Sequence, residues 1–156
     1  KSGIRKAQKN NISVRESNAL AEFWTILDNN LHRKYNVAPV HTLAELELLK
    51  TRFPKEIRLF MAFNSANSPI GGTIIYETPC VIHTQYISAS PEGKANGALD
   101  LLFEHLLNKV YADRKCFFDF GKSTENEGHD LNEPLIFQKE GFGGRGLCYD
   151  AYEWET

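Results

Sequence analysis

The sequence has few cysteines, no long hydrophobic run and no clustered histidines. Its three cysteines, Cys80, Cys116 and Cys148, are odd in number, widely spaced and form no CxxC pair. This pattern argues against a disulfide framework or a zinc site, and it favours a reducing, cytoplasmic location. The longest apolar runs fall far short of the roughly 20 residues that span a bilayer, so no membrane insertion is expected. The spacings of the five histidines show no metal-binding signature, so no metal is expected.

The sequence also lacks a strong excess of either charge. Its 18 Lys and Arg side chains against 20 Asp and Glu give a net charge of −2, which does not favour binding to DNA or to a membrane surface. With 156 residues, of which 42% are hydrophobic, the chain is long enough for one domain with a substantial core. The basic segment 1–9 has almost no apolar face, so we expect a solvated tail there.

The first half of the sequence predicts two helices and then three strands. A helix from about Ser17 to Tyr35 has an apolar stripe at intervals of three and four residues: Leu20, Phe23, Trp24, Leu27 and Leu31. Thr42 and Glu45 form a capping box for a helix that ends near Arg52. His32, Arg33 and His41 lie at helix ends and suggest surface or capping roles. The expected strands are Ile57–Phe63, Ile70–Glu77 and Cys80–Ile87.

The second half predicts a long helix, a buried strand, a charged loop and a second helix. Ser90 caps the long helix, which begins at Pro91 and ends near Asp113. The apolar run Phe117–Phe120 then predicts a short buried strand. A helix over Glu133–Glu140 follows the charged loop, with Asn132 as its N-cap and Gly141 as a left-handed C-cap. Alternation over Leu147–Trp154, with Tyr149 and Tyr152 on opposite faces, predicts a last strand.

This order of elements, together with the segment from Asp119-Phe120-Gly121 to Gly141-Phe142-Gly143, resembles the GNAT superfamily of acyltransferases. The likeness is closer to the Fem-like branch, which resembles the aminoacyltransferases that build peptidoglycan cross-bridges. The resemblance implies an α/β (α+β) fold with a mostly antiparallel mixed sheet of six or seven strands and about four helices. It also implies that residues 1–10 are a linker or the remnant of an upstream GNAT-like half, and that residues 11–156 form the acyltransferase domain.

In the GNAT superfamily the diphosphate of coenzyme A or acetyl-coenzyme A lies on the amides that open the helix after the third strand of the antiparallel meander. Here that place falls on Ser90–Ala98. The last half of the family pattern matches at Gly93-Lys94-Ala95, but its leading Gln or Arg would fall at Ser90, which does not match. The expected cofactor-binding residues are Ser90, Gly93, Lys94, Ala95, Asn96 and Gly97. In the Fem-like branch this loop is degenerate, and the donor is an aminoacyl-tRNA.

The resemblance implies that the reaction takes place in a gap between the strands Cys80–Ile87 and Phe117–Phe120. Three residues on these two strands could take part in the chemistry. His83 has a side chain that accepts a proton near neutral pH. Tyr86 could protonate a leaving thiolate, and strand alternation places it on the face opposite His83 and Gln85. Asp119 is a carboxylate in an apolar run, and such a group must be paired or functional. Each also has a purely structural interpretation, as a packed or hydrogen-bonded strand residue.

The charged loop after the buried strand, together with the helix and corner that follow it, supplies the expected substrate-binding residues. Lys122 could hold a carboxylate or a phosphate, and Lys139 and Arg145 could meet an anionic ligand. Ser123 and Glu125 complete the set: Lys122, Ser123, Glu125, Lys139 and Arg145. A solvated surface role is the alternative for each of them.

The sequence therefore predicts an enzyme that moves an acyl or aminoacyl group from a thioester or an aminoacyl-tRNA to a small-molecule or peptide amine. The alternative is a non-catalytic GNAT-like half that binds or dimerises within a larger protein. The expected partners are the amine acceptor, a charged tRNA if the donor is an aminoacyl-tRNA, and an upstream half or a second copy of the chain.

Overall fold

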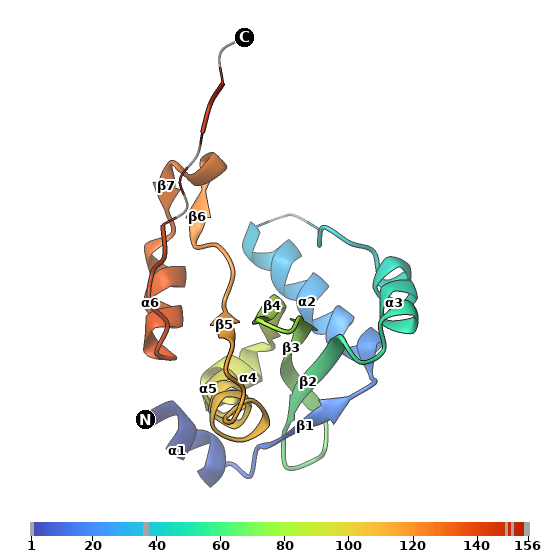
Figure 1. Ribbon diagram of the computed structural model, residues 1–156. Helices are drawn as coiled ribbons and strands as arrows, with labels where there is room; N and C mark the ends of the chain where they lie inside the picture. The colour runs from blue at the N-terminus through green and yellow to red at the C-terminus, as the bar shows by residue number, and fades with distance from the viewer. Residues whose placement is uncertain (1, 36–37, 149, 151, 155–156) are drawn as a thin grey trace. The chain divides into compact units, whose positions relative to one another are not determined.

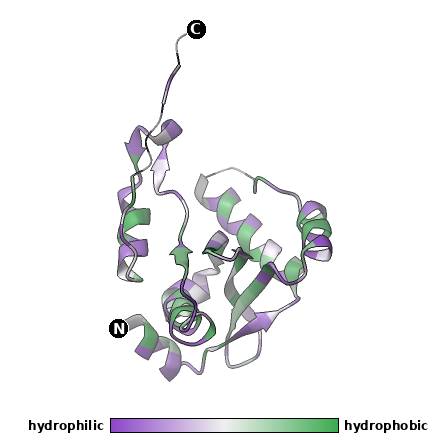
Figure 2. Cartoon of the chain, in the orientation of Figure 1, coloured by the Kyte–Doolittle hydropathy of each residue, from purple (hydrophilic) through white to green (hydrophobic). Residues whose placement is uncertain are grey.

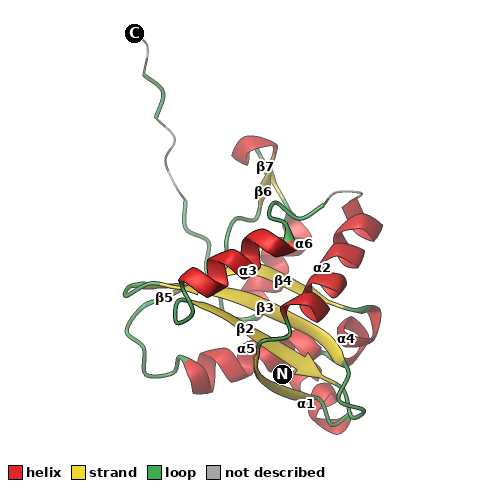
Figure 3. Ribbon diagram, turned by 90° about the vertical axis from the view of Figure 1, so that its right-hand side faces the viewer, coloured by secondary structure: helices red, strands yellow, loops and turns green. Residues whose placement is uncertain are grey.

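The chain divides into two compact units, residues 1–121 and residues 122–156. The structure is a computed structural model that describes residues 2–35, 38–148, 150 and 152–154. The first unit contains one mixed sheet with helices on both faces, and the second contains a two-stranded ribbon and a helix (Figures 1 and 3). The expected mixed α/β class is therefore confirmed.

The sheet of the first unit has five strands, in the spatial order β1-β2-β3-β4-β5. The strands are β1 Ser13–Ser17, β2 Ile57–Phe63, β3 Pro69–Glu77, β4 Val81–Ala89 and β5 Phe117–Asp119. Neighbours from β1 to β4 are antiparallel, and β5 is parallel to β4. The sheet has fewer than the six or seven strands expected, because no described residue of Leu147–Trp154 lies in a strand. Tyr149 lies outside the described residues.

Two helices, α2 Leu20–Tyr35 and α3 Leu43–Arg52, cover one face of the sheet. The predicted stripe of α2 is confirmed, since Leu20, Phe23 and Leu27 are buried and Trp24 and Leu31 pack against them. The capping box of α3 is present: the Thr42 side chain accepts from the Glu45 N–H at 3.2 Å, and the Glu45 carboxylate accepts from the Thr42 N–H at 2.6 Å.

The other face is covered by α4 Pro91–Asn96, α5 Ala98–His105 and the π-helical segment Leu106–Val110. Hydrophobic residues gather on α5 and on β2 in Figure 2. The prediction of one continuous helix is wrong, because the chain breaks at Gly97, whose φ is +73°. A β-carbon on Gly97 would lie 2.5 Å from the Gly3 carbonyl oxygen, so this close approach to the N-terminal segment requires glycine.

The basic N-terminal segment folds as helix α1, Ser2–Lys9, which packs on α5. Ala7 is fully buried and joins a cluster with Ile12, Ala62, Ile70 and Ala98. The expectation of a tail without a packed face is therefore wrong. A single small apolar residue suffices to seat a short helix, and the hydrophobic period of the sequence does not reveal such a contact.

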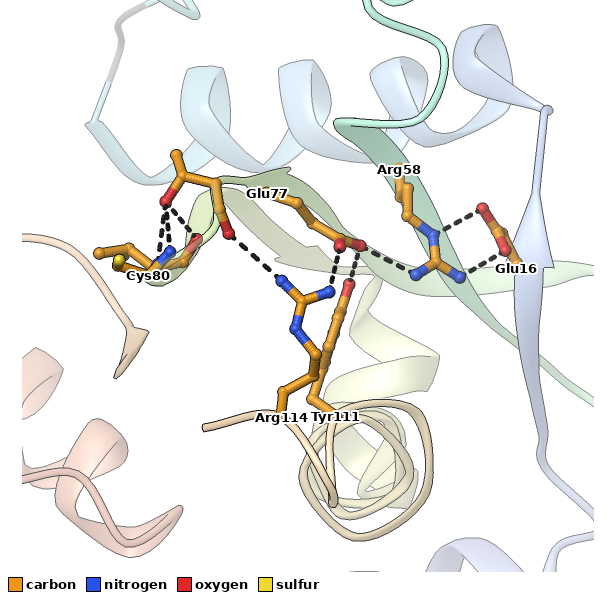
Figure 4. Close-up of polar contacts among 8 residues, drawn as sticks. Glu16, Arg58, Glu77, Cys80, Tyr111 and Arg114 are labelled. Carbon is orange, nitrogen blue, oxygen red and sulfur yellow. Dashed lines mark hydrogen bonds and ion pairs between the residues drawn. The ribbon is translucent and has the colours of Figure 1, made fainter. Parts of the chain in front are cut away.

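A polar network joins β1, β2 and β3 to the residues that follow the π-helical segment Leu106–Val110 (Figure 4). Arg58 on β2 holds the Glu16 carboxylate through two hydrogen bonds, at 2.9 and 2.7 Å, and the Glu77 carboxylate at 2.8 Å. The Tyr111 hydroxyl donates to the same Glu77 oxygen at 2.6 Å, and Arg114 lies 3.5 Å from the other oxygen. These contacts link β1, β2 and β3 to the turn that follows the π-helical segment.

The second unit contains β6 Thr124–Glu125, β7 Asp130–Leu131 and α6 Glu133–Gly141. Asn132 caps α6 as predicted, and its side chain accepts from the Leu135 N–H at 3.0 Å. Gly141 is not the left-handed C-cap: it lies in the helix, and Gly143 is the residue with positive φ, +97°.

Candidate active site

The candidate site lies where β4 and β5 part, in the first unit. Their parallel pairing covers Val81–His83 against Phe117–Asp119, and β4 then continues to Ala89. Within the described residues, the second half of β4 therefore has no strand partner on this edge. No residue of the short strand β5 is buried: Phe117 is 78% exposed, and Phe118 and Asp119 are partly exposed, so the prediction of a buried strand is wrong. A strand edge without a partner presents backbone groups to which a ligand can bind.

A β-bulge in β4 decides which side chains face the same way. Ile75 pairs with Thr84 and Ile74 pairs with Tyr86, so Gln85 is an extra residue. Residues that are paired across strands share a face, which places His83 with Tyr76 and Tyr86 with Ile74. The prediction that Tyr86 faces away from His83 is therefore wrong: both lie on the face that α2 and α3 cover, because the bulge interrupts the alternation.

His83 and Asp119 form a direct pair across this junction. His83 Nδ1 lies 2.7 Å from one Asp119 carboxylate oxygen, and the other oxygen accepts the Gly121 N–H at 2.7 Å. The two side chains are 33% and 40% exposed. Thr84 also donates to the Asp119 carbonyl oxygen, at 3.1 Å. The carboxylate fixes the orientation of the imidazole by binding Nδ1. Nε2 is then the ring nitrogen that can exchange a proton with a ligand.

The Tyr86 hydroxyl contacts a residue that the sequence did not suggest. His41, in the connection before α3, places Nδ1 at 2.7 Å from Tyr86 Oη and donates its backbone N–H to the same oxygen at 3.2 Å. The Trp24 ring meets Tyr86 edge-on, with 5.7 Å between centroids. The Tyr76 hydroxyl is buried on this face without a hydrogen-bond partner among the described residues, and burial, aided by Tyr86, raises the pKa of Tyr76.

The expected cofactor-binding segment lies at the start of α4 and α5, and much of it serves packing. Ser90 caps α4: its hydroxyl accepts the Gly93 N–H at 3.1 Å and donates to the Ile70 carbonyl oxygen at 3.1 Å. A β-carbon on Gly93 would lie 2.1 Å from that Ile70 oxygen. A β-carbon on Gly97 would likewise lie too close to the Gly3 carbonyl oxygen. The Lys94 ammonium donates to Asn30 of α2, and Asn96 accepts from Asn10 at 3.2 Å. Ala95 is exposed.

The expected substrate-binding residues all belong to the second unit, whereas His83 and Asp119 belong to the first. Lys139 is only 8% exposed, and its ammonium donates to the Lys122 carbonyl oxygen at 2.6 Å. Glu125 accepts from the Asn132 amide at 2.6 Å, and the Ser123 carbonyl oxygen accepts from the Asn132 N–H at 2.9 Å. Arg145 donates to the neighbouring Gly144 carbonyl oxygen at 2.7 Å.

Two further properties of the described part of the chain bear on the class of site. It contains no group of three or more His, Cys, Asp or Glu side chains that could hold a metal ion. It also contains no helix with the length and apolar character needed to cross a bilayer.

Several solved structures with similar folds are acetyltransferases, although no protein-family model matches the sequence and no curated protein matches it significantly. A possible acetyltransferase from Clostridium difficile 630 superposes with a TM-score of 0.66 and 13% identity, over 93% of this chain and 97% of that chain. Aminoglycoside antibiotic 6'-N-acetyltransferase from Acinetobacter baumannii gives 0.56 and 13%, over 93% and 98%. The enzyme AAC(6')-Iy, in complex with the bisubstrate analogue CoA-S-monomethyl-acetylneamine, gives 0.61 and 14%, over 93% and 98%.

At these identities the likeness establishes the fold. The chain shares the fold of these acetyltransferase structures, a mixed sheet flanked by helices, which is the fold that the resemblance in its sequence implied.

Proposed function

We propose that the protein is an N-acyltransferase that moves an acyl group from a thioester of coenzyme A to an amine. The observation that carries this proposal is the His83–Asp119 pair, 2.7 Å apart, at the point where β4 and β5 separate. An enzyme of this kind needs a base for the attacking amine, a proton for the leaving thiolate and an edge of backbone groups to hold the donor. The junction offers residues for each of these tasks.

In this mechanism the acceptor binds as a neutral amine, and His83 Nε2 takes one proton from its nitrogen as that nitrogen attacks, while Asp119 holds the ring. The amine nitrogen then bonds to the thioester carbon, and the carbon–sulfur bond breaks. The Tyr86 hydroxyl, held by His41, gives its proton to the leaving thiolate. The products are an amide and a free thiol. His83 then releases its proton to solvent and Tyr86 regains one from solvent, which restores both side chains for the next turnover. The neighbouring complex with a CoA-based bisubstrate analogue supports coenzyme A as the donor.

Membership of the Fem-like branch would make aminoacyl-tRNA the donor, and an upstream half or a second copy of the chain would complete the substrate-binding site. The residues predicted to bind the cofactor, from Ser90 to Gly97, would hold coenzyme A only if the donor is a thioester of coenzyme A. Lys122, Ser123, Glu125, Lys139 and Arg145 stay proposed as contacts to the acceptor.

A non-catalytic binding role is the competing proposal. One observation favours it: Gly93 and Gly97 are explained by close backbone packing alone, without a phosphate. The catalytic proposal explains what this alternative does not, namely a partly exposed histidine oriented by a carboxylate at an open strand edge.

The experiment incubates the purified chain separately with acetyl-coenzyme A and with charged tRNA, each against a panel of primary amines. Acetylated or aminoacylated product is measured by mass spectrometry, since the exposed Cys80 and Cys148 would react with thiol reagents. Transfer that is lost in His83→Gln supports the proposal. Absence of any transfer above the rate in His83→Gln, from a folded protein, would favour the binding role.

A further inference from the structure

A pocket of about 570 Å³ lies between α2 and the junction of β4 with α4. Four of its residues follow α2 at the spacing of one helix face: Ile26, Asn29, Asn30 and Arg33. The opposite wall is formed by Ala89, Ser90 and Pro91. Its volume falls within the range of small-molecule sites, roughly 300 to 1,000 Å³. The pocket therefore has room for part of a ligand.

Most polar groups around the pocket are already engaged. The Asn30 side-chain oxygen accepts from the Lys94 ammonium, which leaves the Asn30 amide N–H groups as donors. His32 Nδ1 lies 3.1 Å from the Asp28 carboxylate. The Ser90 hydroxyl is used within its own helix cap and by a backbone carbonyl. These groups shape the pocket and leave few positions for a ligand's polar atoms.

Arg33 carries the permanent positive charge of the pocket lining. Within the part of the chain that the structure describes, its guanidinium has no hydrogen-bond or ion-pair partner, and no Asp or Glu lines the pocket. By contrast, Arg58 is held by two carboxylates. A guanidinium presents a planar fork of N–H donors that matches a carboxylate or a phosphate. The pocket is therefore positively charged and suited to an anionic group.

We infer that this pocket receives the anionic end of an elongated ligand and that Arg33 binds its carboxylate or phosphate. The pocket adjoins the face that carries Tyr86, and Ala89 lies three residues along β4 from it, or about 10 Å at about 3.3 Å per residue. The inference rests on the proposed function for the position of the reacting end. The anion belongs either to the acceptor, as a carboxylate, or to the donor, as a phosphate, and a polycationic amine is disfavoured.

The test is a binding titration by calorimetry with wild type, Arg33→Gln and a matched control, Arg52→Gln, which removes an exposed arginine at the end of α3. The probes are coenzyme A, triglycine with a free carboxylate, and triglycine amide. We expect Arg33→Gln to weaken binding of coenzyme A or of triglycine by about 10- to 100-fold, the effect of a charged hydrogen-bonding group. Arg52→Gln should bind as wild type does. The probe that loses affinity identifies the source of the anion.

The inference would be overturned if Arg33→Gln and Arg52→Gln bound the probes with equal affinity. It would also be overturned if wild type bound triglycine and triglycine amide equally well and Arg33→Gln did not weaken the binding of coenzyme A. A third contrary result is that neither coenzyme A nor triglycine binds to wild type at millimolar concentration. The outcome is separable from that of the proposed function because it needs no turnover. Binding that depends on Arg33 without any acyl transfer would sustain the pocket and contradict the transferase. Acyl transfer together with binding that does not depend on Arg33 would support the transferase and contradict the assignment of the pocket.

Discussion

The Asp119 carboxylate binds His83 Nδ1 with one oxygen and the Gly121 N–H with the other, each at 2.7 Å. Both atoms of the carboxylate are therefore fixed, and the imidazole has one orientation relative to the strand edge. Because the two residues pair across β4 and β5 at the last position of the parallel ladder, the pair also marks where the strands separate.

We predict that Asp119→Asn lowers kcat/KM for acyl transfer by about 100- to 10,000-fold, the range expected when a base loses its orientation. The free energy of unfolding should change by less than about 1 kcal/mol, because both side chains are partly exposed. Asp113→Asn, at an exposed site, is the control and should match wild type. A fully active, stable Asp119→Asn protein would remove Asp119 from the mechanism.

Two tyrosines on the same face should respond differently to loss of the hydroxyl. Tyr86→Phe removes the partner of His41 and should lower kcat about 10- to 100-fold with little change in KM. Tyr76→Phe removes a buried hydroxyl without a partner, so stability should be unchanged or higher by up to about 1 kcal/mol. Steady-state kinetics and thermal unfolding of both variants check this. Equal kinetics in the two variants would show that Tyr86 only packs.

The sequence predicts the elements that depend on periodic hydrophobic residues. The stripe of α2 and the capping box of α3 are local signals, and the structure confirms both. The break at Gly97 could not be predicted in this way, because it depends on the distant backbone of Gly3. Leu147–Trp154 alternates, but alternation alone does not provide a neighbouring strand with which to pair.

The candidate site was predictable in part. His83 and Asp119 were identified singly, from a histidine on a strand and a carboxylate in an apolar run, and their pairing depends on strand register, which residue types do not specify. No residue pattern in the sequence indicates the bulge at Gln85, which places Tyr86 on the same face as His83. His41 reaches Tyr86 only because the chain folds back before α3.

The network in Figure 4 predicts a difference between two glutamates. Glu77 is 12% exposed and contacts Arg58 and Tyr111, so Glu77→Gln should lower the free energy of unfolding by about 2–3 kcal/mol. Glu16 contacts Arg58 but is 49% exposed, so Glu16→Gln should cost less than about 1 kcal/mol. Urea unfolding of the two variants measures both values. Equal losses would mean that Glu77 carries no special share of the network.

Stability should also fall at high pH through Tyr111. Burial, and then the hydrogen bond to Glu77, raise the pKa of Tyr111 above its ordinary value near 10. The folded protein therefore favours the neutral phenol, and this contribution is complete below about pH 10 and is lost as the pH rises further. Unfolding free energies from pH 8 to 11 should decline more steeply in wild type than in Tyr111→Phe. Parallel declines in the two proteins would contradict the assignment.

The close contact between Gly97 and Gly3 gives the last prediction, which concerns the N-terminal helix. Gly97→Ala places a methyl group at +73° φ and 2.5 Å from the Gly3 carbonyl oxygen, so α1 must shift away from α5 or the backbone must strain. We expect a loss of about 1–3 kcal/mol in the free energy of unfolding. The same substitution at Gly146, where a β-carbon meets no atom within 4 Å, is the control and should change stability little.

Hydrogen exchange of the Ser2–Lys9 amides separates the two causes of this loss. Faster exchange in Gly97→Ala but not in Gly146→Ala shows that α1 has loosened, whereas unchanged exchange with lower stability shows backbone strain. Unchanged exchange and unchanged stability together would mean that α1 does not depend on this contact.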